Sequence, residues 1–219
     1  LDLEPYGSRF LVFSKRPAPW QAQPSTTPPV ADPIELSGAW KASFDGLGRS
    51  IIMDRLRSWT EDPETRFYSG VASYEKTVTV SPELLRRGGA LFLDLGEARP
   101  EPGIPSEHRP GMRAWLEAPV REAAVVYVNG RRAGAVWRPP YEVNLTGLLR
   151  PGANQLRILV ANTAINRLAG GPLPDYTALE RQYGSRFQPQ DMENLQPVPS
   201  GLLGNIRLVT RPARNQLSQ

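Results

Sequence analysis

The chain has 219 residues, with 26 Lys and Arg against 22 Asp and Glu, one His, no Cys and a formal net charge of +4. The lack of cysteine excludes disulfides, thiol nucleophiles, iron–sulfur clusters and cysteine-ligated zinc, and a single histidine excludes a His-rich metal centre. Hydrophobic residues make up 40% of the chain beside 23 Pro and 19 Gly, which favours a folded, turn-rich, all-β protein over a disordered one.

The charge pattern and the hydropathy pattern exclude two classes of partner. Basic residues are scattered singly, with short doublets such as Arg86-Arg87, and no Lys/Arg stripe interleaves with aromatic residues, so we expect no nucleic-acid partner. No apolar run approaches the ~18 residues that cross a bilayer, so we expect no membrane span. The opening LDLEPYGSRFLVFS lacks an initiator Met and a signal-peptide pattern, and we interpret it as the interior of a longer polypeptide.

The first 33 residues divide into two expected segments. Residues 1–16 contain the apolar run Arg9–Ser14, which we interpret as the terminal strand of a preceding domain. Residues 17–33 read PAPWQAQPSTTPPVADP, a composition typical of a Pro-rich linker, in which Trp20 can pin the segment to a neighbouring surface.

Residues 34–212 are expected to form one β-sandwich domain, followed by a tail at 213–219. Apolar alternation and turn signals predict strands at 36–44, 71–80, 90–95, 123–128, 131–137, 141–145, 155–162 and 206–210. Within 71–80 the two faces are mixed, which predicts a strand with one buried and one wetter side; one face carries Ala72, Tyr74, Lys76, Val78 and Val80. Asn129-Gly130 lies between two strands and predicts a hairpin with a type I′ turn.

The remaining segments are connections. Ser81 before Pro82 predicts a single helical turn, and TAINRLAGG after the strand at 155–162 predicts one or two more. Residues 96–119 have no clean period and predict a long surface loop, while 172–199 are expected to be irregular. About eight short strands without a βαβ unit predict an all-β fold, an antiparallel β-sandwich or jelly roll with short helical turns.

No residue pattern predicts catalysis by this chain. Glycosidases need two rigidly held carboxylates, whereas the loop at 96–119 carries Glu97, Glu101, Glu107 and Glu117 on a proline-rich segment, where solvated loop charges are the better interpretation. His108 lies in the same loop with no triad partner, and nucleophile-elbow and nucleotide-binding glycine motifs are missing. We therefore predict no catalytic residue here.

Sugar recognition has more support, because it needs aromatic rings to stack on pyranoses and amide or charged groups to bind hydroxyls. Trp137 and Tyr141 follow the hairpin, and Asn162, Asn166 and Arg167 follow a strand, so the rim of a sandwich can gather all five. The alternative interpretation places Trp137 in the core and makes Asn162 a turn or helix cap. These five residues are the candidate carbohydrate-binding residues.

Four phrases carry a family resemblance that runs from about Leu36 to Thr210. FYSGVASYEKTVTV, LFLDLG, REAAVVYVNGRRAGAVWRPPYEVNLTGLLRPGANQLRILVANTAINRLAGG and SGLLGNIRLVT resemble the carboxy-terminal region of glycoside hydrolase family 106, the α-L-rhamnosidases. They are similar, more distantly, to the sugar-binding jelly-roll domain of family 2 β-galactosidases and β-glucuronidases. The insertion at 96–119 departs from the pattern, because LDLG runs directly into the next strand in that family.

The resemblance implies a galactose-binding-like β-sandwich, non-catalytic by itself, within a secreted or periplasmic bacterial enzyme that removes rhamnose from glycans. The partner it implies is the catalytic barrel domain of the parent enzyme, with a rhamnose-containing glycan as ligand. An autonomous carbohydrate-binding module and a purely structural or interaction sandwich are the alternatives. No cofactor is expected, although many such sandwiches hold a structural Ca²⁺ in their loops, and the sequence leaves that metal undecided.

Overall fold

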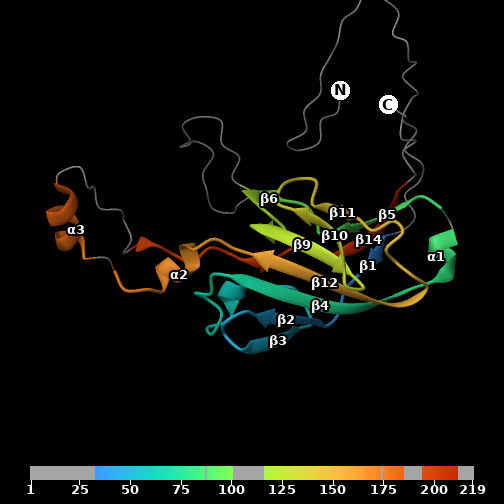
Figure 1. Ribbon diagram of the computed structural model, residues 1–219, viewed down its shortest axis with the longest axis horizontal. Helices are drawn as coiled ribbons and strands as arrows, with labels where there is room; N and C mark the ends of the chain where they lie inside the picture. Colours follow the sequence, from blue (N-terminus) through green and yellow to red (C-terminus); the bar gives the residue numbers. More distant parts are fainter. Residues whose placement is uncertain (1–32, 87, 101–115, 174, 185–193, 212–219) are drawn as a thin grey trace, which may run out of the picture.

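The structure, a computed structural model, describes residues 33–86, 88–100, 116–173, 175–184 and 194–211 (Figure 1). The strand expected within 1–16, most of the expected linker including Trp20, the central part of the 96–119 loop with His108, and the tail at 213–219 lie outside the described residues. The described strands run from Ile34 to Arg211.

Two antiparallel sheets make up the domain. The smaller has four strands in the order β1 (Ile34–Glu35), β14 (Arg207–Arg211), β5 (Ala90–Asp94) and β11 (Glu142–Asn144). The larger has six, in the order β10 (Arg131–Val136), β9 (Ala123–Val128), β12 (Gly152–Ala161), β4 (Val71–Val80), β2 (Trp40–Phe44) and β3 (Arg49–Met53). Two short ladders pair β13 (Gly201–Leu202) with β8 (Val120–Arg121) and β6 (Arg99–Pro100) with β7 (Leu116–Glu117).

The helices are short: η1 (Trp59–Glu61), α1 (Pro82–Arg86), α2 (Ile165–Ala169) and α3 (Tyr176–Tyr183). The helical turn predicted after residue 80 is α1, and its cap is present because the Leu84 amide donates to Ser81 Oγ at 3.2 Å. The predicted all-β antiparallel sandwich with short helical turns is confirmed.

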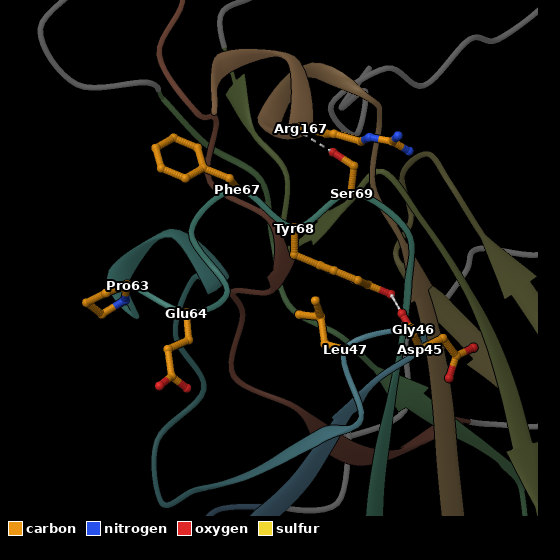
Figure 2. Close-up of a pocket in the computed structure, with 9 residues that line it drawn as sticks. All are labelled: Asp45, Gly46, Leu47, Pro63, Glu64, Phe67, Tyr68, Ser69 and Arg167. Carbon is orange, nitrogen blue, oxygen red and sulfur yellow. Dashed lines mark hydrogen bonds between the residues drawn. The ribbon is translucent and has the colours of Figure 1, made fainter. Parts of the chain in front are cut away.

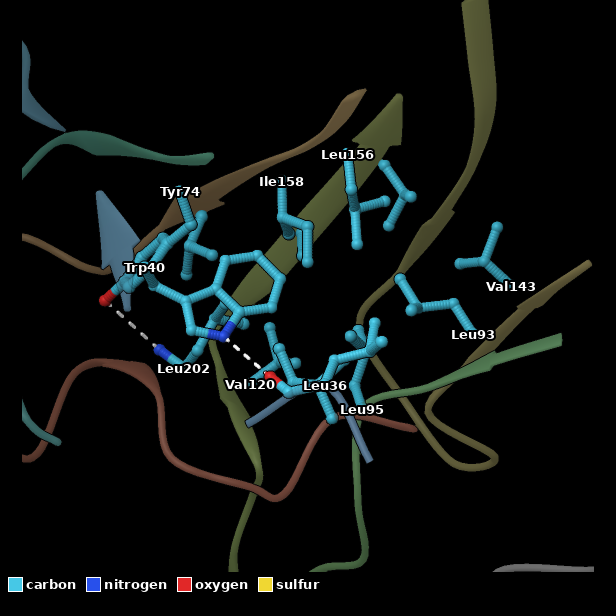
Figure 3. Packing of buried hydrophobic residues seen from close by; sticks show 14 of the residues in the cluster. Leu36, Trp40, Tyr74, Leu93, Leu95, Val120, Val143, Leu156, Ile158 and Leu202 are labelled. Carbon is cyan, nitrogen blue, oxygen red and sulfur yellow. Dashed lines mark hydrogen bonds between the residues drawn. The ribbon is translucent and has the colours of Figure 1, made fainter. Parts of the chain in front are cut away.

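The core lies between the inward faces of the two sheets, which follows from the period-2 pattern of their strands. In β12, Leu156, Ile158 and Val160 are buried while the residues between them are exposed or half-buried. All four of Leu156, Ile158, Leu93 and Val143 belong to one core cluster, and Figure 3 shows Leu156 on the side of Ile158 that faces Leu93 and Val143 of the smaller sheet. Each such aliphatic side chain contributes about 1.5–3 kcal/mol when fully buried, so this layer is the main source of stability.

The predicted Asn-Gly hairpin joins β9 to β10. Asn129 and Gly130 have φ angles of 50° and 80°, the positive values that a type I′ turn requires. Asn129 Nδ2 also donates to Asn154 Oδ1 at 2.9 Å, and Asn129 Oδ1 accepts from the Gln155 amide at 3.0 Å. The turn residue therefore fixes the hairpin to the start of β12 as well as reversing the chain.

Several elements differ from the sequence-based expectation, among them the ladder of β6 and β7 at the two ends of the predicted 96–119 loop and the ladder of β8 and β13. Residues 172–199 were expected to be irregular, but Tyr176–Tyr183 form α3, capped by Asp175 Oδ1, which accepts from the Ala178 amide at 3.0 Å. This helix has no buried residue, so it has no apolar period to reveal it. The edge strand β3 was also not anticipated, because its five residues are mostly not buried and Ile52 is 61% exposed.

A buried aromatic pair connects the larger sheet to η1. Trp59 and Tyr74 are both 0% exposed, and Trp59 Nε1 donates to the Tyr74 hydroxyl at 2.5 Å. The same hydroxyl accepts from the Leu202 amide at 3.4 Å, drawn as a dashed line in Figure 3. Trp59 also packs edge-on against Phe44 and Tyr68, with ring centroids 5.5 Å apart in both pairs. Together these contacts close the core at the end where β2 and β12 finish.

The Trp59–Tyr74 pair makes the folded state less stable at alkaline pH. Burial raises the pKa of Tyr74 from its ordinary 10.0 to about 12, against smaller lowering by the hydrogen bonds from Trp59 and Leu202. The folded state therefore holds the phenolic proton more tightly than the unfolded chain. The stabilisation is fully present below pH 10 and is lost as the pH rises toward 12, at up to about 1.4 kcal/mol per pH unit.

Urea unfolding at pH 8 and pH 11 measures this loss. Tyr74→Phe should be less stable than the parent at pH 8, because the Trp59 indole loses its acceptor, yet it should lose less stability between the two pH values. Parallel losses in the two proteins would assign the alkaline effect to other groups.

Candidate functional site

One end of the larger sheet, which we call the rim, gathers the ends of several strands. The antiparallel register places these pairs at that end: Val136 opposite Ala124, Ala161 opposite Val71, and Phe44 opposite Ala72. The chain leaves the sheet there at Trp137, Asn162 and Asp45, after β10, β12 and β2 respectively. Four strand steps separate β10 from β2, so Trp137 and Asp45 leave the sheet about 19 Å apart.

The two aromatic candidates lie in different environments. Trp137 is 69% exposed, and the Arg138 guanidinium lies 5.6 Å from the centroid of its ring. Tyr141 is only 9% exposed and belongs to the core, where its carbonyl accepts from the Leu95 amide at 2.9 Å. Trp137 therefore presents a ring to solvent, whereas Tyr141 does not offer a ring face to a sugar.

The two asparagines form a network with Ser200, which we call the amide latch (Asn162, Asn166 and Ser200). Asn166 is 0% exposed; its Nδ2 donates to the Val198 carbonyl at 3.0 Å and its Oδ1 accepts from the Val198 amide at 2.8 Å. Asn162 Oδ1 accepts from the Gly70 amide at 2.9 Å. Nδ2 of both asparagines donates to Ser200 Oγ at 3.1 Å. The polar groups of both asparagines are thus bonded within the domain.

Arg167 is the sequence-predicted residue that borders a hollow. Its backbone amide donates to Ser69 Oγ at 2.9 Å, which joins α2 to the segment before β4. Beside it lies an open depression of about 380 Å³ (Figure 2). The depression is lined by Asp45, Gly46, Leu47, Pro63, Glu64, Phe67, Tyr68, Ser69 and Arg167.

Hydrogen bonds and close packing fix the residues that line this depression. The Tyr68 hydroxyl donates to the carbonyls of Asp45 at 2.9 Å and Val71 at 2.7 Å. Burial, with the negative charge of Asp45, raises the pKa of Tyr68, so the hydroxyl keeps its proton at neutral pH. A Cβ on Gly170 would come within 2.7 Å of three Phe67 atoms, so the Phe67 ring packs closely on the end of α2.

Two charged groups in the depression are available to a ligand. Among the described residues, neither the Asp45 carboxylate nor the Arg167 guanidinium has a hydrogen-bond or ion-pair partner. Glu64, by contrast, is paired with Arg49. Sequence reasoning found Arg167 but missed Asp45, Phe67 and Ser69, because only the packing of the β2–β3 turn and the 58–70 segment against α2 brings them together.

The acidic side chains of the described residues form neither a metal-binding cluster nor a free buried acid. The described part of the chain contains no group of three or more His, Cys, Asp or Glu side chains placed to hold a metal ion. Asp94 is the one buried carboxylate in that part. Arg207 donates to it at 2.5 Å, so Asp94 is not a free acid. This hydrogen bond raises the pKa of Arg207.

Comparison with known proteins places this fold inside much larger chains. No family model matches the sequence. A Formosa agariphila protein named "Putative beta-glucuronidase" is 31% identical over 151 residues, which is 67% of this chain and 11% of that protein. A rhamnosidase structure from Novosphingobium sp. PP1Y matches at 28% identity with a TM-score of 0.61, over 90% of this chain and 16% of that one. The chain resembles a sandwich domain of glycoside hydrolases.

A more distant structure shares the fold. The Bifidobacterium dentium β-glucuronidase complexed with coumarin-3-O-glucuronide matches at 18% identity with a TM-score of 0.54, over 87% of this chain and 31% of that one. The chain thus spans between about a tenth and a third of the proteins it matches. No helix among the described residues is long and apolar enough to cross a membrane.

Proposed function

We propose that this chain is a non-catalytic accessory β-sandwich of a larger glycoside hydrolase of the family 106 α-L-rhamnosidase type. The observation that carries the proposal is the match to the Novosphingobium rhamnosidase, which covers 90% of this chain but only 16% of the enzyme. A domain that makes up so small a share of an enzyme is expected to assist a neighbouring domain that performs the chemistry. Its partner is the catalytic domain of the parent enzyme, against which it packs beside the substrate pocket.

The chemistry of the described residues supports an accessory role. Retaining and inverting glycosidases need one carboxylic acid and one carboxylate facing each other across the scissile bond. The one buried carboxylate of the described residues, Asp94, is occupied by Arg207 and by the Gly96 amide at 2.9 Å. The exposed carboxylates of the rim, Asp45 and Glu64, lie on turns rather than on rigid strands.

Hydrolysis assays test this assignment. The 219-residue chain alone should not hydrolyse nitrophenyl α-L-rhamnoside above the rate of a buffer blank, whereas the parent polypeptide should. Deleting this domain from the parent should lower the melting temperature or the rhamnosidase activity, because a covered surface is exposed. Hydrolysis by the isolated chain would overturn the non-catalytic role. We further propose a secreted or periplasmic bacterial parent, which cell fractionation followed by the same assay checks.

A second candidate function is autonomous carbohydrate binding, favoured by the exposure of Trp137 at the rim. On this alternative, Trp137→Ala should abolish heat release when a rhamnose-containing oligosaccharide is titrated into the chain. A structural sandwich without ligand predicts no heat with any glycan. The proposal includes no cofactor, and addition of EDTA or CaCl₂ should leave the melting temperature of the chain unchanged; a rise with Ca²⁺ would reveal a structural calcium site.

A further inference from the structure

We propose that the depression between Asp45 and Arg167 binds a neutral pyranose sugar through those two charged side chains. The proposal goes beyond the accessory role and rests on the local geometry alone. It also places the sugar away from Trp137, at the opposite side of the rim.

The first argument is the chemistry of the free groups. A carboxylate only accepts hydrogen bonds and a guanidinium only donates them, so Asp45 and Arg167 together complement sugar hydroxyls, which do both. Ser69 Oγ accepts from the Arg167 amide and keeps its own proton to donate to a sugar oxygen. The two side-chain charges cancel, so a neutral ligand fits better than an anion, which meets Asp45, or a cation, which meets Arg167.

The second argument is the apolar surface beside these groups. Leu47 is 47% exposed and Phe67 is 43% exposed, and both line the depression together with Pro63. A pyranose has an apolar C–H face and a hydroxyl edge, so a wall that is apolar on one side and charged on the other matches it. Figure 2 shows Leu47 between the positions of Glu64 and Asp45, with Arg167 on the α2 side.

The third argument is that the backbone on both sides is already fixed. The Asp45 amide donates to the Val71 carbonyl at 3.2 Å, and its own carbonyl accepts from the Tyr68 hydroxyl. Arg167 is held through its amide and through the buried Asn166 that precedes it. A ligand therefore orders two side chains and no loop, which limits the entropic cost of binding.

Size and openness set the expected affinity. A volume of about 380 Å³ lies at the low end of the ~300–1,000 Å³ typical of ligand sites, so it accommodates one or two sugar units rather than a long chain. An open site that covers one face of a monosaccharide leads us to expect a Kd of about 1–10 mM.

Saturation-transfer NMR and titration calorimetry on the 219-residue chain test the site. The neutral probes are methyl α-L-rhamnoside and methyl β-D-galactoside; the charged probes are D-glucuronate and D-glucosamine. At least one neutral probe should bind, and both charged probes should bind more weakly than it does. The absence of binding by both neutral probes would overturn the proposal.

Charge variants make the test specific to this depression. Asp45→Asn and Arg167→Ala should each weaken the binding of the neutral sugar at least tenfold. Asp45→Asn should also strengthen the binding of D-glucuronate relative to that of the neutral sugar, because a repulsive charge is removed. Arg131→Ala is the matched control: Arg131 is also exposed, but it lies at the other end of β10, and its loss should change nothing. Circular dichroism checks that each variant is folded.

Two other outcomes are decisive. Loss of sugar binding in Trp137→Ala with full binding in Arg167→Ala would place the ligand at Trp137 and overturn the proposal. Full sugar binding in both Asp45→Asn and Arg167→Ala would also overturn the proposal. If the two variants at the same time failed to associate with the catalytic domain, the depression would be an interdomain contact. Because these readouts use binding and the accessory role is tested by hydrolysis, each can fail without the other.

Discussion

Replacing Gly201 with alanine is expected to destabilise the domain by about 3–5 kcal/mol. Gly201 has a φ angle of +107°, and a Cβ there would lie 2.5 Å from both Trp59 Nε1 and the Tyr74 hydroxyl. These two groups are buried and bonded to each other, so neither can move aside without breaking that hydrogen bond. Urea unfolding at pH 7.5 should show the loss as a lower midpoint with an unchanged slope.

Gly46→Ala is the matched control for this substitution. Gly46 also has a positive φ angle, +82°, but no atom lies within 4 Å of the position of its Cβ. It should therefore cost only the backbone strain, about 1–2 kcal/mol. Equal losses at the two positions would show that backbone strain, and not the collision with Trp59 and Tyr74, determines the effect at Gly201.

Replacing Asn166 with alanine is expected to cost about 2–4 kcal/mol. The change removes the acceptor of the Val198 amide, one of the two donors to the Val198 carbonyl and one donor to Ser200 Oγ, at a position that is 0% exposed. Groups left unpaired away from water cost more than the bonds contribute when formed. Thermal unfolding followed by circular dichroism measures the loss, which for a domain of this size corresponds to a Tm lower by about 5–15 °C.

Asn205→Ala tests whether the effect belongs to the amide latch. Asn205 is exposed and makes no side-chain hydrogen bond among those resolved for the described residues, so its removal should change the free energy of unfolding by less than about 0.5 kcal/mol. The double variant Asn162→Ala with Asn166→Ala should lose less than the two single losses added, because both amides donate to Ser200. Strict additivity would mean that the latch does not act as a unit.

Strands that bury at least one face were predictable from the sequence, and elements that bury little were not. The alternation of Val71–Val80 matches the bounds of β4, and Asn129-Gly130 supplied the turn between β9 and β10. β3 and α3 escaped because they bury little, so no apolar period marks them. Apolar periodicity reflects the burial of one face, so an element that hardly contacts the core has little apolar periodicity in its sequence.

The candidate site was predictable in its location but not in its composition. Strand ends predicted that Trp137 and Asn162 leave the sheet at the same rim, and the register agrees. The structural role of Asn166 was not visible, because its partners Val198 and Ser200 lie more than 30 residues away in a segment without regular structure. Asp45 was missed for a similar reason: a carboxylate in a short turn has the sequence pattern of any solvated charge, and only the structure shows that it lines the same depression as Arg167.

The turn between β2 and β3 has a consequence for evolution and engineering. This turn supplies Asp45, Gly46 and Leu47 to the depression, and neither Gly46 nor Gly48 has an atom within 4 Å of its Cβ position. The chain can therefore be lengthened or exchanged there without displacing any core side chain. A library confined to these few positions could alter what the depression accepts while the latch and the aromatic core stay intact, so new specificity can be selected on an unaltered scaffold.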